Sequence, residues 1–349
     1  MPGGLRRVAG TVAVGAALVG VAVGLLLALL TVTGQPAGAA LAALWRGAFG
    51  SADAIVSGTL VRATPLVLAG LAVALAFRAG VLNVGAEGQL LAGAGAAAAA
   101  GTFLTPTLGG ATVVAALVAG TIAGAAWAGI AAGLRRRFGV LEVISTIMLN
   151  FVALYAVGYL VRGPLQEPTR VYPQSPTLAP GARLPLLVPD SRLHVGVAVA
   201  ILAAAILWWV LRDTAAGFRV RAAGLSPTAA SSAGLVDVPR VTGRAFLVSG
   251  TLAGLAGAVE VTGVTFALYE NLSPGYGYTA IAVALLAGLH PLGVIATGVL
   301  FGALEAGASA MQRDAGVPAT TVRVVEALLI LLVLGGERLR AAYRMRVDA

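Results

Sequence analysis

The stretch Ala111–Leu134, ATVVAALVAGTIAGAAWAGIAAGL, contains 24 residues and no charge, and Arg135, Arg136 and Arg137 follow it directly. About 20 apolar residues in a helix span the hydrocarbon core of a bilayer, and arginine clusters favour its cytosolic side. The stretch therefore predicts a membrane-spanning helix that ends at the cytosol.

The composition of the whole chain supports the same fold class. Of its 349 residues, 59% are hydrophobic and 11% are charged, and the mean hydropathy is +0.94, whereas soluble proteins carry about 25% charged residues. We predict an all-α integral membrane protein, a single transmembrane domain over residues 1–349 with about ten spans. The expected spans are 8–33, 56–77, 88–103, 111–134, 140–161, 195–211, 243–266, 279–289, 292–311 and 320–334.

One of these spans is too short to cross a bilayer. The run 279–289 has about 11 residues, or roughly 17 Å of helix, against a hydrocarbon core of about 30 Å. His290 and Pro291 interrupt the apolar pattern directly after it. A broken or re-entrant segment is expected there, and transporters place such segments at cavities because the freed backbone groups need polar surroundings.

Arginine alone decides the predicted topology, because the chain has no lysine. If the N-terminus is cytosolic and the spans alternate, the loop 162–194 is extracytoplasmic, whereas the coupling loop 213–242 and the tail 336–349 are cytosolic. Both termini then lie in the cytosol. Of the 23 arginines, 15 fall on that side, at positions 6, 7, 78, 135, 136, 137, 212, 219, 221, 240, 244, 338, 340, 344 and 346.

Several kinds of chemistry are disfavoured by the residues the chain lacks. Without cysteine there is no disulfide or thiolate metal site, and without lysine a Walker A phosphate loop cannot form. The two histidines, His194 and His290, lie far apart and have no clustered carboxylates, so no metal site is expected. No catalytic residues are expected, and the net charge of +9 is too dispersed for a nucleic-acid surface.

A short capped helix is predicted inside the segment 217–234. Ser226 is a good N-cap, Pro227 suits the first helical position, and Gly234 suits the position after the C-cap. Arg219 and Arg221 lie just upstream. Because so short a helix is marginal by itself, it is either held by a partner protein or is an ordinary connector with a turn.

Two groups of polar residues stand in or beside apolar spans. Asn83, Glu87 and Gln89 lie with two glycines where the span 88–103 begins, so this turn either approaches a ligand or only caps the helix and offsets its dipole. In the span 140–161, a stripe on one helical face either lines an aqueous path or hydrogen-bonds to neighbouring helices. The stripe consists of Glu142, Thr146 and Asn150, with Ser145 beside it.

Two carboxylates, Glu260 and Glu305, lie inside apolar runs without a partner close in sequence. An ionisable residue inside a membrane is a functional hypothesis by default. They leave open an ion-coupled secondary transporter as an alternative function.

Four ordered stretches resemble the permease subunits of bacterial ABC importers for nucleosides and simple sugars, a group related to the permeases for branched-chain amino acids and monosaccharides. The nucleoside branch is the most similar, through the runs Gly-Ala-Glu-Gly-Gln and Ser-Thr-Ile-Met-Leu-Asn. The four stretches are 77–89, 142–150 with 163–166, 221–234, and 302–312 with 316–318.

The resemblance implies a multi-pass protein of the bacterial cytoplasmic (inner) membrane that moves nucleosides, or alternatively simple sugars, by alternating access. It implies a second, related permease subunit, an extracytoplasmic binding lipoprotein, and two cytosolic ATPases that hold ATP and Mg. The chain itself would then need no cofactor and would not be an enzyme.

The resemblance also implies a coupling helix that docks on an ATPase, formed by Arg221, Gly224, Ser226, Pro227, Ala230 and Gly234. Relatives commonly have Asn at the position of Ser226, but both residues cap helices. From polarity and spacing, the candidate substrate path comprises Asn83, Glu87, Gln89, Ser145, Thr146 and Asn150.

Overall fold

The structure is a computed structural model that describes residues 20–21, 23–232, 234, 236–318, 320–324 and 327–328. Within these residues every regular element is a helix, and the only β pairing is two isolated bridges. Six of the described helices are long and apolar enough to cross a membrane. The all-α membrane class is thus confirmed, whereas the described part of the chain does not establish ten spans. Half of the expected first span, part of the last one and the tail 336–349 lie outside it.

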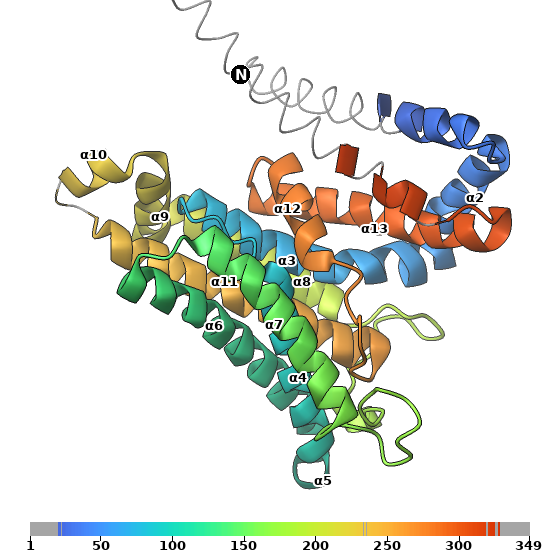
Figure 1. The fold of residues 1–349 in the computed structure, drawn as a ribbon, viewed down its shortest axis with the longest axis horizontal. Helices are drawn as coiled ribbons and strands as arrows, with labels where there is room; N and C mark the ends of the chain where they lie inside the picture. The colour runs from blue at the N-terminus through green and yellow to red at the C-terminus, as the bar shows by residue number, and fades with distance from the viewer. Residues whose placement is uncertain are drawn as a thin grey trace, which may run out of the picture. The chain divides into compact units, whose positions relative to one another are not determined.

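The helices, labelled as in Figure 1, follow the expected spans closely, and two of them are π-helical turns. In chain order they are α2 (Ala37–Phe49), η1 (Ala54–Leu60), α3 (Val61–Arg78), α4 (Ala86–Phe103), α5 (Thr105–Leu108), η2 (Gly109–Ala111), α6 (Thr112–Phe138), α7 (Glu142–Arg162), η3 (Pro180–Ala182), α8 (Gly196–Asp213), α9 (Ala215–Leu225), α10 (Pro227–Ser232), α11 (Val238–Glu260), η4 (Val261–Thr265), α12 (Tyr276–Leu286) and α13 (Pro291–Ala315).

The chain divides into two compact units, one of them Leu60–Gly302 and the other made of the segments before and after it. In the smaller unit, α2 packs on the later turns of α13, where Gly47 and Gly307 allow the backbones to approach. Its core includes Leu30, Ala43 and Met311, all fully buried. The sequence did not predict α2, because its 13 residues include Arg46 and are too few for a span.

The larger unit is built on tight packing between α4, α6 and α11. Gly254 of α11 lies against the backbone of α6 at Gly124 and against Gly93 of α4, and a methyl group would fit at none of the three. Small residues at such crossings let transmembrane helices associate without large apolar side chains. These three glycines therefore let the backbones of α4, α6 and α11 approach one another closely.

The predicted break in the last third of the chain is also present. The helix α12 has 11 residues, and a non-helical turn separates its end at Leu286 from the start of α13 at Pro291. Leu289 in this turn has a left-handed backbone with φ of 57°. Because a proline cannot donate a backbone hydrogen bond, it is tolerated in the first turn of α13 but would interrupt a continuous helix.

Candidate functional site

Two cavities lie near the two ends of the long helix formed by α11 and η4. The smaller cavity, of about 420 Å³, is lined by the C-terminal residues Glu260, Val264 and Thr265, and we call it the Glu260 cavity. The larger one, of about 910 Å³, is lined by the N-terminal residues from Val238 to Leu247 together with parts of α6, α9 and α10. The helix formed by α11 and η4 therefore contributes lining residues to both of these cavities.

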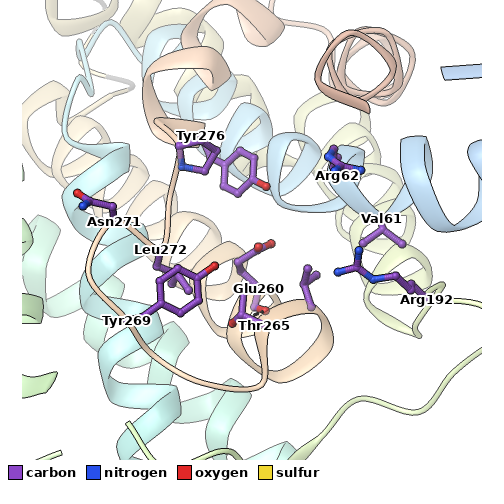
Figure 2. Close-up of a pocket in the computed structure, with 11 residues that line it drawn as sticks. Val61, Arg62, Arg192, Glu260, Thr265, Tyr269, Asn271, Leu272 and Tyr276 are labelled. Atoms are coloured by element: carbon purple, nitrogen blue, oxygen red, sulfur yellow. Dashed lines mark hydrogen bonds between the residues drawn. The ribbon is translucent and has the colours of Figure 1, made fainter. Parts of the chain in front are cut away.

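The Glu260 cavity brings polar side chains together from separate parts of the chain (Figure 2). Arg62 comes from the first turn of α3, Arg192 from the loop before α8, and Glu260 from the end of α11. The segment between η4 and α12 supplies Tyr269, and Tyr276 begins α12. Glu260 and Tyr276 are buried, with 3% and 6% of their surface exposed, whereas Arg192 is exposed, so the cavity has a buried floor and an accessible rim.

The helix that carries Glu260 changes from α-helical to π-helical form directly after this residue. Residues 261–265 make a π-helical turn, and the Phe266 N–H donates to the Val261 carbonyl at 2.9 Å, five residues back. Phe266 then takes a left-handed conformation with φ of 55°, which ends the helix. Such π-helical turns occur often at functional sites. The sequence predicted a single continuous span here, because hydrophobic periodicity does not separate one π turn from an α-helix.

One carboxylate oxygen of Glu260 lacks a partner. Among the described residues, Oε2 has no hydrogen bond although it is fully buried. Arg62 and Arg192 line the same cavity, and their positive charges attract the Glu260 carboxylate. The charges of these two arginines offset part of the cost of burying the carboxylate, but they do not give Oε2 a hydrogen bond.

The wall that carries Tyr269 is fixed by the loop between α7 and α8. The Ser175 N–H donates to the Leu268 carbonyl at 2.7 Å, and the Leu268 N–H donates to Ser175 Oγ at 2.9 Å. Arg162 donates two hydrogen bonds to Glu270, at 2.7 and 2.8 Å. The loop 162–194 was predicted only as a connector, yet it orders one side of the cavity.

His194 lies at the end of the same loop and is fully buried. Its Nδ1 accepts a hydrogen bond from the Gly196 N–H at 3.1 Å, and the ring lies against Gly263 of η4. Burial, assisted by the nearby charge of Arg192, lowers the pKa of His194 to about 4. The imidazole is therefore neutral at neutral pH.

Three of the predicted path residues, which lie in the turn before α4 and in its first turn, take part in buried hydrogen bonds. Asn83 donates to Gln89 Oε1 at 2.9 Å and to Ser249 Oγ at 2.8 Å, and Gln89 donates back to Asn83 Oδ1 at 3.1 Å. Glu87 accepts from the Gly277 N–H at 2.6 Å, which joins α4 to the start of α12. Ser249 was not singled out from the sequence, since one serine in an apolar span gives no distinctive signal.

The residues of the predicted stripe on α7 make different kinds of hydrogen bonds in the structure. Asn150 accepts from the Gly88 N–H at 2.8 Å and donates to the Val84 carbonyl at 3.0 Å, so it holds the first turn of α4. Ser145 and Thr146 are buried and donate within their own helix, to the carbonyls of Glu142 and Val143. None of the six predicted path residues lines either cavity. Their assignment to the path stays a prediction.

The capped helix predicted in the coupling segment is present as α10. Ser226 Oγ accepts from the Ala229 N–H at 3.4 Å at the start of α10, and Gly234 has φ of 67°. Arg219 and Arg221, which the sequence places just upstream of this helix, lie in the separate helix α9. Thr214 caps α9 by accepting from the Gly217 N–H at 3.1 Å.

The residues of the coupling segment are not equally accessible. Gly224 lies against the Arg78 carbonyl at the end of α3, with no room for a side chain, and is thus a packing position. Leu225, in contrast, is 86% exposed, and Ser226 and Pro227 beside it are exposed as well. Ala230 is half-buried.

Of the two membrane carboxylates, only Glu260 belongs to a described cavity. Glu305 lies on α13 in the smaller unit, is half-buried and does not line the Glu260 cavity.

Comparison with known sequences gives a match over most of the chain. The family described as "Branched-chain amino acid transport system / permease component" matches residues 55–334. The guanosine ABC transporter permease protein NupP of Bacillus subtilis is 39% identical over 93% of both chains. The glucose ABC transporter permease protein TsgB13 of Haloferax volcanii is 39% identical over 80% of this chain and 75% of its own length.

A second guanosine permease protein of Bacillus subtilis, NupQ, is 30% identical over 71% of this chain and 79% of its own length. No solved structure matches the chain significantly.

Proposed function

Because this chain belongs to the family of permease components of branched-chain amino acid transport systems, we propose that it is the membrane-spanning subunit of an ABC importer that carries nucleosides. The observation that carries the proposal is the similarity to a guanosine permease protein along nearly the whole of both chains. The chain is a transport subunit, and ATP hydrolysis is assigned to separate chains, in keeping with the lack of a lysine for a Walker A loop.

The partners in this proposal are two ATPases, a second permease subunit and an extracytoplasmic binding lipoprotein. The ATPases would dock on α9 and α10, where Leu225 is exposed. These helices lie at the end of the larger unit that holds the larger cavity, which is lined by Arg135, Arg136, Arg240 and Arg244. A heteromeric pair of permeases is supported by the similarity of this chain to both NupP and NupQ of one organism.

The orientation follows from the same clustering of arginine. Arginine-rich loops favour the cytosolic face of the inner membrane, so the α9–α10 end is assigned to the cytosol and the Glu260 cavity to the extracytoplasmic end. Cargo would then reach the Glu260 cavity first and leave at the opposite end after ATP-driven movement of α9 and α10.

A second candidate cargo is a simple sugar. The glucose permease protein TsgB13 is as similar to this chain in percentage identity as NupP is, although it covers less of the sequence. Uptake measurements must therefore compare guanosine with glucose.

The test is transport by the reconstituted complex in proteoliposomes. We expect uptake of radiolabelled guanosine only when the ATPases, ATP and the binding protein are all present, with no effect of a proton ionophore. Uptake of glucose in place of guanosine would replace the proposed cargo. Uptake by this chain alone, driven by an ion gradient, would instead support the ion-coupled transporter with Glu260 or Glu305.

A further inference from the structure

The Glu260 cavity has the features of a binding site for a small polar molecule. Its volume of about 420 Å³ lies within the range of small-molecule sites, about 300–1,000 Å³. The floor is buried, and the carboxylate of Glu260 points into the space between the two tyrosines and the two arginines (Figure 2). Inside this space, Oε2 is a buried acceptor without a donor among the described residues.

The chemistry of the lining restricts what can occupy the cavity. The oxygen Oε2 of Glu260 has no hydrogen-bond donor among the described residues, so a group that donates to it must carry an O–H or N–H. The guanidinium groups of Arg62 and Arg192 donate only, so the same molecule benefits from acceptors nearby. A hydroxyl group meets both demands, because it donates one hydrogen bond and accepts two.

The aromatic walls favour a molecule with a ring. Tyr269 and Tyr276 lie on one side of the Glu260 carboxylate, and Arg62 and Arg192 lie on the other (Figure 2). Aromatic faces contact sugar rings and nucleobases through dispersion and stacking, with little dependence on sequence or substituent. A molecule that combines a ring with adjacent hydroxyls therefore fits the whole lining.

We propose that the Glu260 cavity binds the hydroxylated ring of the transported molecule, with a ring hydroxyl donating to Glu260 Oε2 and the tyrosines contacting the ring. This inference rests on the proposed function for the identity of the cargo, because it takes the ring to be the ribose of a nucleoside. The recognised group, however, is shared by guanosine and glucose, the molecules named for two relatives.

The experiment compares guanosine with 2′,3′-dideoxyguanosine in the complete reconstituted transporter. Wild type and the variants Glu260→Met and Glu260→Gln are assayed with the same binding protein, so the preference of that protein cancels in the ratio of kcat/KM values. Methionine keeps the length of the side chain but accepts no strong hydrogen bond, whereas glutamine keeps an acceptor and loses the charge. Asp53→Asn is the control, because Asp53 is an exposed carboxylate that does not line the cavity.

We expect wild type to prefer guanosine, and Glu260→Met to lower kcat/KM for guanosine by at least tenfold while leaving that for the dideoxy compound nearly unchanged. Glu260→Gln should lie between wild type and Glu260→Met, and Asp53→Asn should match wild type. Equal losses for both compounds in Glu260→Gln would indicate a structural role and overturn the proposal, as would full retention of the preference in Glu260→Met. If wild type carries glucose instead, the proposed cargo is wrong, and the same ratio with glucose and 2-deoxyglucose decides this inference separately.

Discussion

At the scale of single residues, the buried amide pair Asn83 and Gln89 shows why polar groups in a membrane span need not contact cargo. Each donates to the other, and Ser249 completes the group by donating to the Ala72 carbonyl at 2.6 Å. The sequence indicated that these residues were unusual. It did not show their partners, because Ser249 is 166 positions away from Asn83.

Replacing Asn83 tests this group. Asn83→Ala leaves the buried side chain of Gln89 without its partner, and an unsatisfied buried amide costs about 1–3 kcal/mol. We expect a loss of stability of that size in thermal unfolding of the purified protein in detergent. Thr251→Ala is the control, because Thr251 is partly exposed and donates to the Val248 carbonyl of its own helix. This replacement should change stability by less than about 0.5 kcal/mol.

His194 predicts a dependence of stability on pH. Its pKa of about 4 in the folded protein lies below the ordinary value of 6.5, so the unfolded chain binds a proton first as the pH falls. The stabilisation is complete above pH 6.5 and is lost as the pH falls toward 4. Between pH 7 and pH 5 the expected loss is about 2 kcal/mol, since one pKa unit corresponds to about 1.4 kcal/mol.

The measurement is the difference between wild type and His194→Phe in unfolding at pH 7 and pH 5. The variant should lack this part of the pH dependence, whatever its absolute stability. An identical loss in both proteins would assign the pH dependence to other groups.

At the scale of helices, apolar run length predicted the positions of α3, α4, α6, α7, α8, α11, α12 and α13 within a few residues. Among the helices that it missed, α2 and α9 contain arginine and are 13 and 11 residues long, so neither gives a span-like signal. The two π-helical turns were missed as well, because they depend on contacts made in the fold. The Glu260 cavity lies beside one of these turns, and its lining residues come from segments far apart in the sequence. Only Glu260 among its polar residues was therefore singled out from the sequence.

The contact between α11 and α6 should not tolerate a single methyl group. Gly254→Ala would place a Cβ against the backbone of Gly124 and Gly120. We expect a loss of at least about 2 kcal/mol or failure to assemble, because overpacking costs about 1–3 kcal/mol and backbone atoms cannot move aside. Gly243 lies on the same helix with open space around it, so Gly243→Ala should be neutral or slightly stabilising in the same unfolding assay.

The proposed docking of ATPases is best tested at Leu225. Gly224→Trp would be a poor test, because Gly224 packs on α3 and its replacement would disturb the permease itself. Leu225→Asp changes an exposed side chain, so we expect unchanged stability but at least a tenfold loss of ATP-dependent uptake. Leu225→Met keeps an apolar contact and should remain active. Wild-type uptake by Leu225→Asp would contradict docking at this residue.

At the scale of the whole molecule, composition and span length predicted a membrane protein, and the resemblance of four stretches predicted a permease. The family match confirms a permease component. The sequence did not predict the division into two units or a loop folded over one cavity, because both depend on packing between distant segments. The cargo is a proposal at this scale too, since the similarity to nucleoside and glucose permeases restricts it without deciding between them.

The glycine contacts of α11 have a mechanical consequence. Helices whose backbones interlock cannot slide past one another easily, so α11 is expected to tilt as a stiff rod together with α4 and α6. From Val238 to Glu260 the helix is roughly 33 Å long, so a tilt of about 5° moves one end by about 3 Å relative to the other. That displacement equals the length of a hydrogen bond. A small angular change at the arginine-rich end would therefore be enough to make or release the contact at Glu260, without any local unfolding of the membrane helices.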